Sequence, residues 1–384
     1  MKALTLKNRK ALQRGVILLL LMFVLFVAGS SVVIGALNNR QSVELARTRE
    51  VHHQLERAKA ELLAYAANYA NFYDDARGPG FFPCPDTDDP QDDPDGLPNY
   101  TGSNPTLQHC TYSTAAVGRL PKIEIFSATS YRFNDTYADI DEQFWYVAAP
   151  RYLYSATATD RRSYYRTYWD TSTPTVASIA STRWLTLDGA TGYVALIIAP
   201  GEVLPTQDRT AGLANYENYL DGSNGGDGYN FYTSYLNNPE LFNDQVIGIT
   251  LDEYMIHVGT AVAHKVKQGL DALYIQSPSI PKGYPSNINA VIPDTNSNIC
   301  SSNALSDVFD GTNVGLLNPP AWLRNNSPDE TGERWSCAEN VYWKRDFSPN
   351  RHQGYLTFGG CPNIKFRIVY GQPVKREGDT CAPP

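Results

Sequence analysis

Residues 15–39, GVILLLLMFVLFVAGSSVVIGALNN, form a run of 25 residues without a charged side chain. Five basic residues and no acidic residue precede this run: Lys2, Lys7, Arg9, Lys10 and Arg14. Val16 to Leu37 is long enough to cross a bilayer core of about 30 Å as a helix. Positive charge is retained on the cytoplasmic side of a membrane. We therefore expect a single-pass membrane protein whose remaining chain lies outside the cytoplasm.

Two simpler interpretations of this start remain open. The apolar core of a secretory signal peptide is usually about 7–15 residues long and ends at a small-residue cleavage site. Here the apolar run is longer, and its small-residue sites, Ala28-Gly29-Ser30 and Gly35-Ala36, lie inside it. An uncleaved membrane anchor is the second alternative.

The segment after the apolar run has the pattern of a helix. It contains no Pro or Gly between Arg40 and Tyr73. Apolar residues recur at steps of three and four, which places them on one helix stripe: Leu55, Ala58, Leu62, Tyr65, Tyr69 and Phe72. Arg77-Gly78-Pro79-Gly80 is a strong helix breaker. We predict one helix from about Val16 to Ala76, membrane-embedded in its first third and amphipathic in its last half; a coiled-coil stalk is the alternative for the stripe.

With the basic leader Met1 to Gly15, the apolar run Val16 to Leu37 and the long helix, the chain resembles the type IV pilin and type II secretion pseudopilin family. The resemblance implies cleavage by prepilin peptidase between Gly15 and Val16 and methylation of the new N-terminus. It also implies an anchor in the inner membrane, a head in the periplasm or on the cell surface after assembly, and packing against other pilin-like subunits through the N-terminal helix.

The chain departs from the family pattern at two positions. The main subunits of the family have Phe or Met first and Glu fifth after the cleavage point, where this chain has Val16 and Leu20. That Glu is thought to meet the N-terminal amine of a neighbouring subunit, and the large tip subunit of type II secretion lacks it. The resemblance therefore implies a minor subunit that initiates or caps a type IV pilus or a pseudopilus. The alternative is an uncleaved, membrane-anchored periplasmic binding or scaffold protein.

Charge and motifs exclude other classes of function. The leader carries +5 and the whole chain −8, which leaves −13 for the rest. Phosphate affinity needs clustered Lys and Arg, so we expect no nucleic-acid partner. The chain has no Gly-x-Ser-x-Gly elbow, Gly-x-Gly-x-x-Gly fingerprint or Walker loop. We therefore expect a structural protein with no catalytic residues.

All six cysteines follow the apolar run: Cys84, Cys110, Cys300, Cys337, Cys361 and Cys381. An even number of cysteines outside the cytoplasm predicts three disulfides. Pairing of sequence neighbours, 84–110, 300–337 and 361–381, is the simplest of the possible arrangements. Zinc is disfavoured because no Cys-x-x-Cys occurs.

The head is expected to be α+β. We predict an α/β region with an antiparallel sheet at 77–276 and a β-rich, disulfide-bonded lobe at 277–384. Residues 183–188 and 193–199 are predicted to form a hairpin around the turn 189–192, and Gln245 to Ile249 a strand. Thr250-Leu-Asp-Glu253 is a capping box that opens a helix. A final strand pair is predicted at 354–358 and 364–370.

Two loops are rich in oxygen ligands of the kind that calcium prefers. The first, 86–95, has six carboxylates in ten residues, and the second, 221–228, is rich in Gly. Neither follows the EF-hand pattern, and a solvated acidic turn is the alternative for both. Calcium is therefore a candidate cofactor, with these candidate ligands: Asp86, Asp88, Asp92, Asp95, Asp221, Asn224 and Asp227.

Overall fold

The computed structural model describes residues 4–72, 79–86, 117–121, 144–149, 152–153, 184–205, 207–209, 216–222, 224, 228–233, 242–276, 297–298, 341–345, 353–358, 361–378 and 380. The chain divides into two compact units, Met1–Gln54 and Leu55–Pro384. Both sheets, the helix α3 and the end of α1 belong to the second unit.

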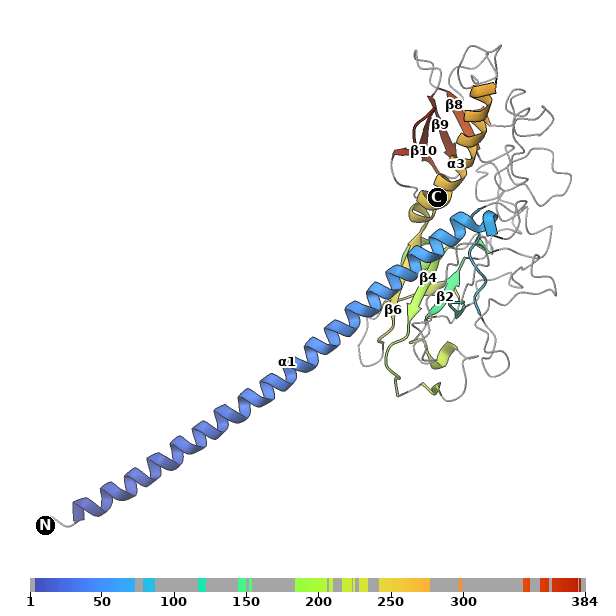
Figure 1. Cartoon of the computed structure of the whole chain (residues 1–384). Coiled ribbons are helices and arrows are strands. Elements are labelled where there is room, and N and C mark those ends of the chain that lie inside the picture. The colour runs from blue at the N-terminus through green and yellow to red at the C-terminus, as the bar shows by residue number, and fades with distance from the viewer. Residues whose placement is uncertain are drawn as a thin grey trace. The chain divides into compact units, whose positions relative to one another are not determined.

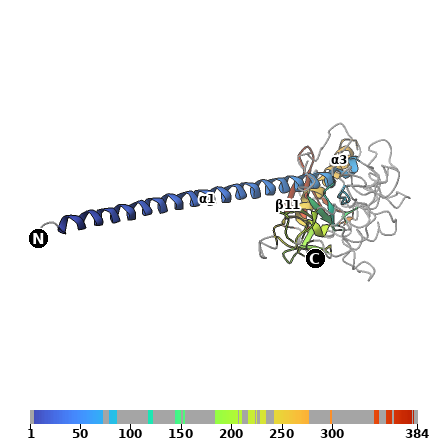
Figure 2. The same cartoon turned by 90° about the horizontal axis from the view of Figure 1, so that it is seen from below.

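The first element is α1, Leu4–Phe72, a single helix of 69 residues. It is uninterrupted (Figure 2) and includes the leader, the apolar run and the amphipathic stripe. Across the described residues, no helix has a segment both long and apolar enough to pass through a membrane. The transmembrane helix of the predicted fold class is therefore wrong. The helix α1 as a whole is not apolar, because it includes charged residues on both sides of the apolar run 15–39.

The first sheet has six strands: β1 Val117–Arg119, β2 Trp145–Ala148, β3 Leu185–Leu187, β4 Ala190–Ala199, β5 Asn230–Phe231 and β6 Gln245–Thr250. Their order is β1-β2-β4-β3-β5, and β6 pairs with β4. The pairing of β3 with β5 is parallel, so the prediction of an antiparallel sheet is wrong. β5 reaches β3 after a long connection that includes the 3-10 helix Tyr216–Asn218, and no tight turn forces the two strands to run in opposite directions.

The hairpin between β3 and β4 turns earlier than predicted. Its two-residue turn is Asp188–Gly189, and both residues have positive φ angles, 52° and 79°. Asp–Gly is a favoured sequence for such turns because both central residues must adopt left-handed conformations. The Thr233 backbone N–H and hydroxyl donate to the Asp188 carboxylate over 2.9 and 2.8 Å, respectively. Three residues that were predicted to lie in the turn therefore belong to β4: Ala190, Thr191 and Gly192.

The helix α3, Leu251–Gln276, follows β6 directly. The predicted capping box is confirmed: the Glu253 N–H donates to Thr250 Oγ1 over 3.3 Å, and the Thr250 N–H donates to Glu253 Oε2 over 2.9 Å. One face of α3 is completely buried through residues that recur at steps of three and four: Met255, Val258, Val262, Val266 and Leu270.

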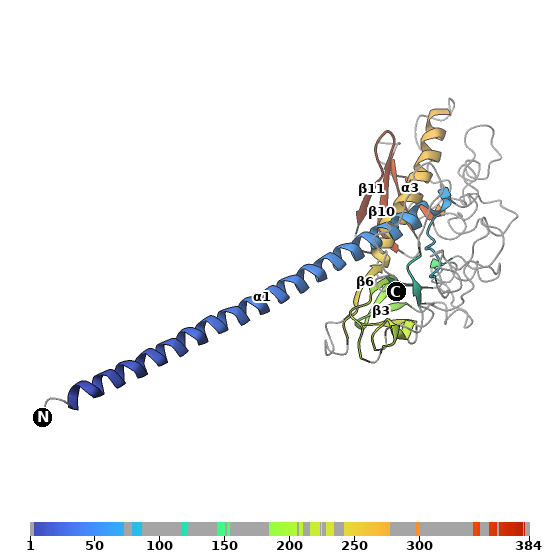
Figure 3. The ribbon, with the colours of Figure 1, turned by 60° about the horizontal axis from the view of Figure 1, so that its bottom comes forward.

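The second sheet is separate and antiparallel, with five strands in the order β11-β10-β9-β8-β7. The strands are β7 Ser297–Asn298, β8 Val341–Arg345, β9 Gln353–Phe358, β10 Cys361–Val369 and β11 Lys375–Gly378. The predicted final strand pair is confirmed as β9 and β10. α3 lies against this sheet (Figures 1 and 3), and a Cβ atom at Gly259 would be 2.9 Å from the Phe366 ring.

The described residues do not support the predicted disulfide-bonded lobe. Cys84 is buried and disulfide-bonded, and its partner lies outside the described residues. The side chain of Cys361 also lies outside them, as do four whole residues: Cys110, Cys300, Cys337 and Cys381. The pairings predicted for the C-terminal lobe therefore have no support, because no bond in that lobe is present among the described atoms.

Candidate functional site

The N-terminal unit exposes large apolar side chains on α1. Eight consecutive residues have exposed fractions between 47% and 74%: Leu20, Leu21, Met22, Phe23, Val24, Leu25, Phe26 and Val27. Successive helix residues are about 100° apart, so eight of them point in every direction around the helix axis. A coiled-coil seam would be apolar along one narrow stripe only. The segment 20–27 therefore presents apolar side chains on every side of the helix.

The last part of α1 has the opposite character, because its stripe is buried in the head. Seven residues have exposed fractions of 4% or less: Leu55, Ala58, Leu62, Leu63, Tyr65, Ala66 and Tyr69. Tyr69 packs on Phe81, with ring centroids 5.0 Å apart. After the helix ends, the Gly80 N–H donates to the Ala66 carbonyl over 2.7 Å, and Gly80 O accepts the Tyr254 hydroxyl over 2.8 Å. The head thus holds this end of α1 by both apolar packing and buried hydrogen bonds.

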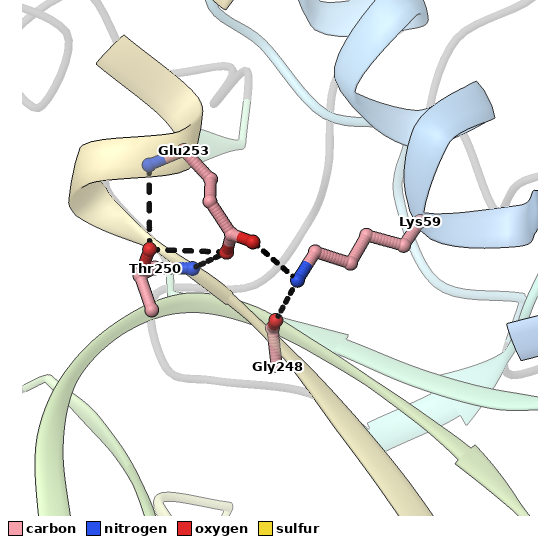
Figure 4. Close-up of polar contacts among 4 residues, drawn as sticks. All are labelled: Lys59, Gly248, Thr250 and Glu253. Atoms are coloured by element: carbon pink, nitrogen blue, oxygen red, sulfur yellow. Dashed lines mark hydrogen bonds and ion pairs between the residues drawn. The ribbon is translucent and has the colours of Figure 1, made fainter. Parts of the chain in front are cut away.

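One lysine on α1 binds the junction of β6 and α3 (Figure 4). Lys59 Nζ donates to the Gly248 carbonyl over 2.8 Å and lies 2.6 Å from Glu253 Oε1. Glu253 therefore uses one carboxylate oxygen for Lys59 and the other for the cap at Thr250. The Lys59 side chain is 13% exposed and that of Glu253 36%. We call Lys59, Gly248, Thr250 and Glu253 the helix anchor.

Electrostatics favour the ionised form of Glu253. Partial burial acts to raise the pKa of this carboxyl, but the hydrogen bond and charge of Lys59 and the hydrogen bonds of Thr250 outweigh burial. The pKa of Glu253 is therefore below its ordinary value. The adjacent residue, Asp252, accepts a hydrogen bond from Arg376 Nη2 on β11 over 3.0 Å. The first turn of α3 thus binds α1 through one carboxylate and the second sheet through the next.

In the first predicted calcium loop, the one described residue, Asp86, pairs with an arginine of the same chain. Asp86 is buried and its carboxylate lies 2.8 Å from Arg119 Nη2, which is also buried. Backbone hydrogen bonds join the same two residues in both directions. Asp86 is thus neutralised by an arginine. Asp88, Asp92 and Asp95 lie outside the described residues.

The second predicted calcium loop forms a buried hydrogen-bond cluster. Asp221 Oδ1 accepts from Gln207 Nε2 over 2.8 Å, and Asp221 Oδ2 accepts the backbone N–H groups of Asn243 and Asp244. Asn224 joins the cluster through Asp244 Oδ2, which accepts from its Nδ2 over 3.0 Å. N–H donors therefore occupy both oxygens of Asp221, where a cation would otherwise coordinate. Asp227 lies outside the described residues.

Asp244 is a member of this cluster that the sequence did not indicate. It is completely buried, and its Oδ2 accepts from the Asp221 N–H and from Asn224. Burial raises the pKa of Asp244 to about 7, and the negative charge of Asp221 adds to the effect. Among the described residues, Asp244 Oδ1 has no hydrogen-bond partner, so this oxygen can carry the proton. The signal that was missed is an Asp directly before an apolar strand.

The processing residues predicted from the leader, Gly15 and Val16, both lie within α1. Their side chains are outside the part of the chain for which burial is described. Among the described residues, no group of three or more His, Cys, Asp or Glu side chains is arranged to hold a metal ion. Comparisons with protein-family models, curated proteins and solved structures find no match to this chain.

Proposed function

We propose that this chain is a minor, pilin-like structural subunit that initiates or caps a filament through the N-terminal part of α1. The observation that carries the proposal is the exposure of eight consecutive apolar side chains at 20–27. Exposed apolar surface on this scale marks an interaction site. Because the side chains point in every direction around the helix, neighbouring helices of other subunits would have to surround it.

The buried end of α1 supports a mechanical role for the helix. The stripe from Leu55 to Tyr69 and the helix anchor attach the head to the same helix that carries the apolar surface. A subunit whose helix is held by neighbours and whose head packs against one face of the helix end can transmit force between the neighbours and the head. The basic leader supports export of the head, with prepilin peptidase acting between Gly15 and Val16.

Crosslinking tests the assembly surface directly. A photoreactive amino acid at Phe23 or Phe26 is expected to capture small pilin-like subunits in the cell of origin, because both positions are exposed, at 64% and 74%. The same amino acid at Val203, a head position that is 56% exposed, is the control and should not capture them. Equal capture from Val203, or none from the helix, would contradict the proposal.

Processing gives an independent test. N-terminal sequencing of the chain purified from cells with active prepilin peptidase should begin at Val16, with a methylated amine. Retention of Met1 to Gly15 under those conditions would reject the pilin-like assignment. It would not affect the crosslinking test, which concerns only the apolar surface of α1.

Leu20 tests the position in the filament. At a tip no neighbour supplies an amine, so the carboxylate of Leu20→Glu would be buried among apolar side chains without a partner, which is unfavourable by about 2 kcal/mol or more. We expect Leu20→Glu to enter sheared filaments less than wild type, and Leu20→Met to enter equally. High-copy incorporation of Leu20→Glu along the shaft would exclude the capping role.

A further inference from the structure

The outward face of β10 and β11 gathers positive charge in an otherwise acidic chain. On β10, Ile364, Phe366 and Ile368 are completely buried, so the alternating residues Lys365 and Arg367 occupy the opposite face. The register places Lys375 of β11 directly opposite Arg367, and Glu377 opposite Lys365. We call Lys365, Arg367 and Lys375 the basic face.

This arrangement breaks a rule of strand pairing. Like charges directly opposite each other destabilise a sheet, yet Arg367 and Lys375 are such a pair. Glu377 is the carboxylate that reaches Arg367, over 3.6 Å, and Gln353 accepts a hydrogen bond from Arg367 over 2.9 Å. Lys365 and Lys375 are both exposed. Within the described parts of the chain, neither lysine takes part in an ion pair or hydrogen bond.

Protection of the sheet edge does not account for the basic face. Lysine on an edge strand discourages pairing with other chains, and β11 is the last strand of its sheet. Lys365 and Arg367, however, lie on β10, which has β9 and β11 on its two sides. An interior strand has no open edge to protect. Glu377 and Gln353 engage Arg367, but no described ion pair or hydrogen bond offsets the two lysines. Places where a sequence breaks a local rule are expected to be functional.

We propose that the basic face binds an acidic peptide segment of a partner protein. Residues two apart on a strand are about 7 Å apart, and neighbouring strands are about 5 Å apart, so the three cations match carboxylates spaced along an extended chain. Arg367 offers a planar fork that binds carboxylate through two hydrogen bonds. A long polyanion fits less well, because the chain carries −8 overall and would repel it beyond this face.

A titration of the full chain tests this proposal without filament assembly. The probe is a fluorescent peptide with the sequence of residues 86–95, DTDDPQDDPD, and the comparison is the same peptide with Asn at every Asp. Anisotropy should report binding of the Asp peptide only, and binding should weaken as salt rises from about 0.02 to 0.3 M. Lys365→Gln/Lys375→Gln should weaken binding about fivefold, because each exposed ion pair contributes little.

The matched control is Arg49→Gln/Lys265→Gln, which removes the same charge from positions on α1 and α3. This control should bind the Asp peptide within twofold of wild type. Equal weakening by the two double variants would overturn the proposal, because it would reflect net charge alone. Tighter binding of polyphosphate or single-stranded DNA than of the Asp peptide, or no binding of the peptide at low salt, would overturn it as well.

Discussion

Replacing Lys59 by Met tests whether the helix anchor holds α1 to the head. The change keeps most of the aliphatic side chain and removes one hydrogen bond from a charged donor, to Gly248, and one ion pair, to Glu253. A hydrogen bond that involves a charged group contributes about 1.5–3 kcal/mol. The ion pair adds less than about 1 kcal/mol, because Glu253 is 36% exposed. We expect a loss of about 2 kcal/mol in the free energy of unfolding.

Lys267→Met is the matched control for this measurement. Lys267 is also 13% exposed and pairs with a carboxylate, but its partner is Asp271 on the same helix. Such pairs contribute about 0.3–0.5 kcal/mol. Urea unfolding of the full chain, followed by tryptophan fluorescence, should therefore show a loss for Lys59→Met several times that for Lys267→Met. Equal losses would refute the conclusion that Lys59 holds α1 to the junction of β6 and α3.

The effect of Lys59→Met should also depend on pH. The pKa of Glu253 is lowered in the folded protein from an ordinary value of 4.5. A lowered pKa stabilises the folded state above the unfolded-state value, and this contribution is lost as pH falls through the folded-state pKa. The difference between wild type and Lys59→Met should therefore be full at pH 6 and narrow as pH falls below about 4.5. A difference that stays constant down to about pH 3 would mean that the pairing with Glu253 contributes nothing.

Three further changes test other parts of the fold. Gly248→Ala should destabilise the head by about 1–3 kcal/mol, since a Cβ atom there would lie 2.2 Å from Tyr193 Cδ1; an unchanged urea midpoint would contradict this packing. Thr250→Val removes the cap of α3 and should lower the free energy of unfolding by about 1–2 kcal/mol, measured in the same assay. Asp244→Asn tests the raised pKa of Asp244. The free energy of unfolding of wild type should fall as pH rises from 3.8, the ordinary pKa of Asp, to about 7, the pKa of Asp244 in the folded protein. The reason is that Asp244 loses its proton at a lower pH in the unfolded state than in the folded state. That slope should be shallower in Asp244→Asn, and an unchanged slope would assign the titration to another group.

Local patterns in the sequence predicted local structure well. Thr250 and Glu253 are three residues apart, and the cap that they form requires nothing else, so it was predictable from spacing. The buried face of α3 and the pairing of β9 with β10 were predictable for the same reason. Each involves neighbours in the sequence or a short connection.

The sequence did not indicate contacts between distant segments. Lys59 and Gly248 are 189 residues apart, and an isolated lysine on a helix face gives no sign of its partner. Asp221 has the Gly-rich surroundings of a calcium ligand, but N–H donors at Gln207, Asn243 and Asp244 occupy its oxygens. The parallel pairing of β3 with β5 was missed because nothing in the strands themselves encodes their direction.

The first turn of α3 has a consequence for how the chain is made. Its two acidic residues bind Lys59, near the start of the head, and Arg376, near the end of the sequence. During synthesis the chain appears from its N-terminus, so the contact with Lys59 becomes available long before the contact with Arg376. Contacts between residues that are far apart in sequence form slowly. The second sheet therefore cannot be completed until β11 has been synthesised, and the contact of Asp252 with Arg376 forms later than that of Glu253 with Lys59.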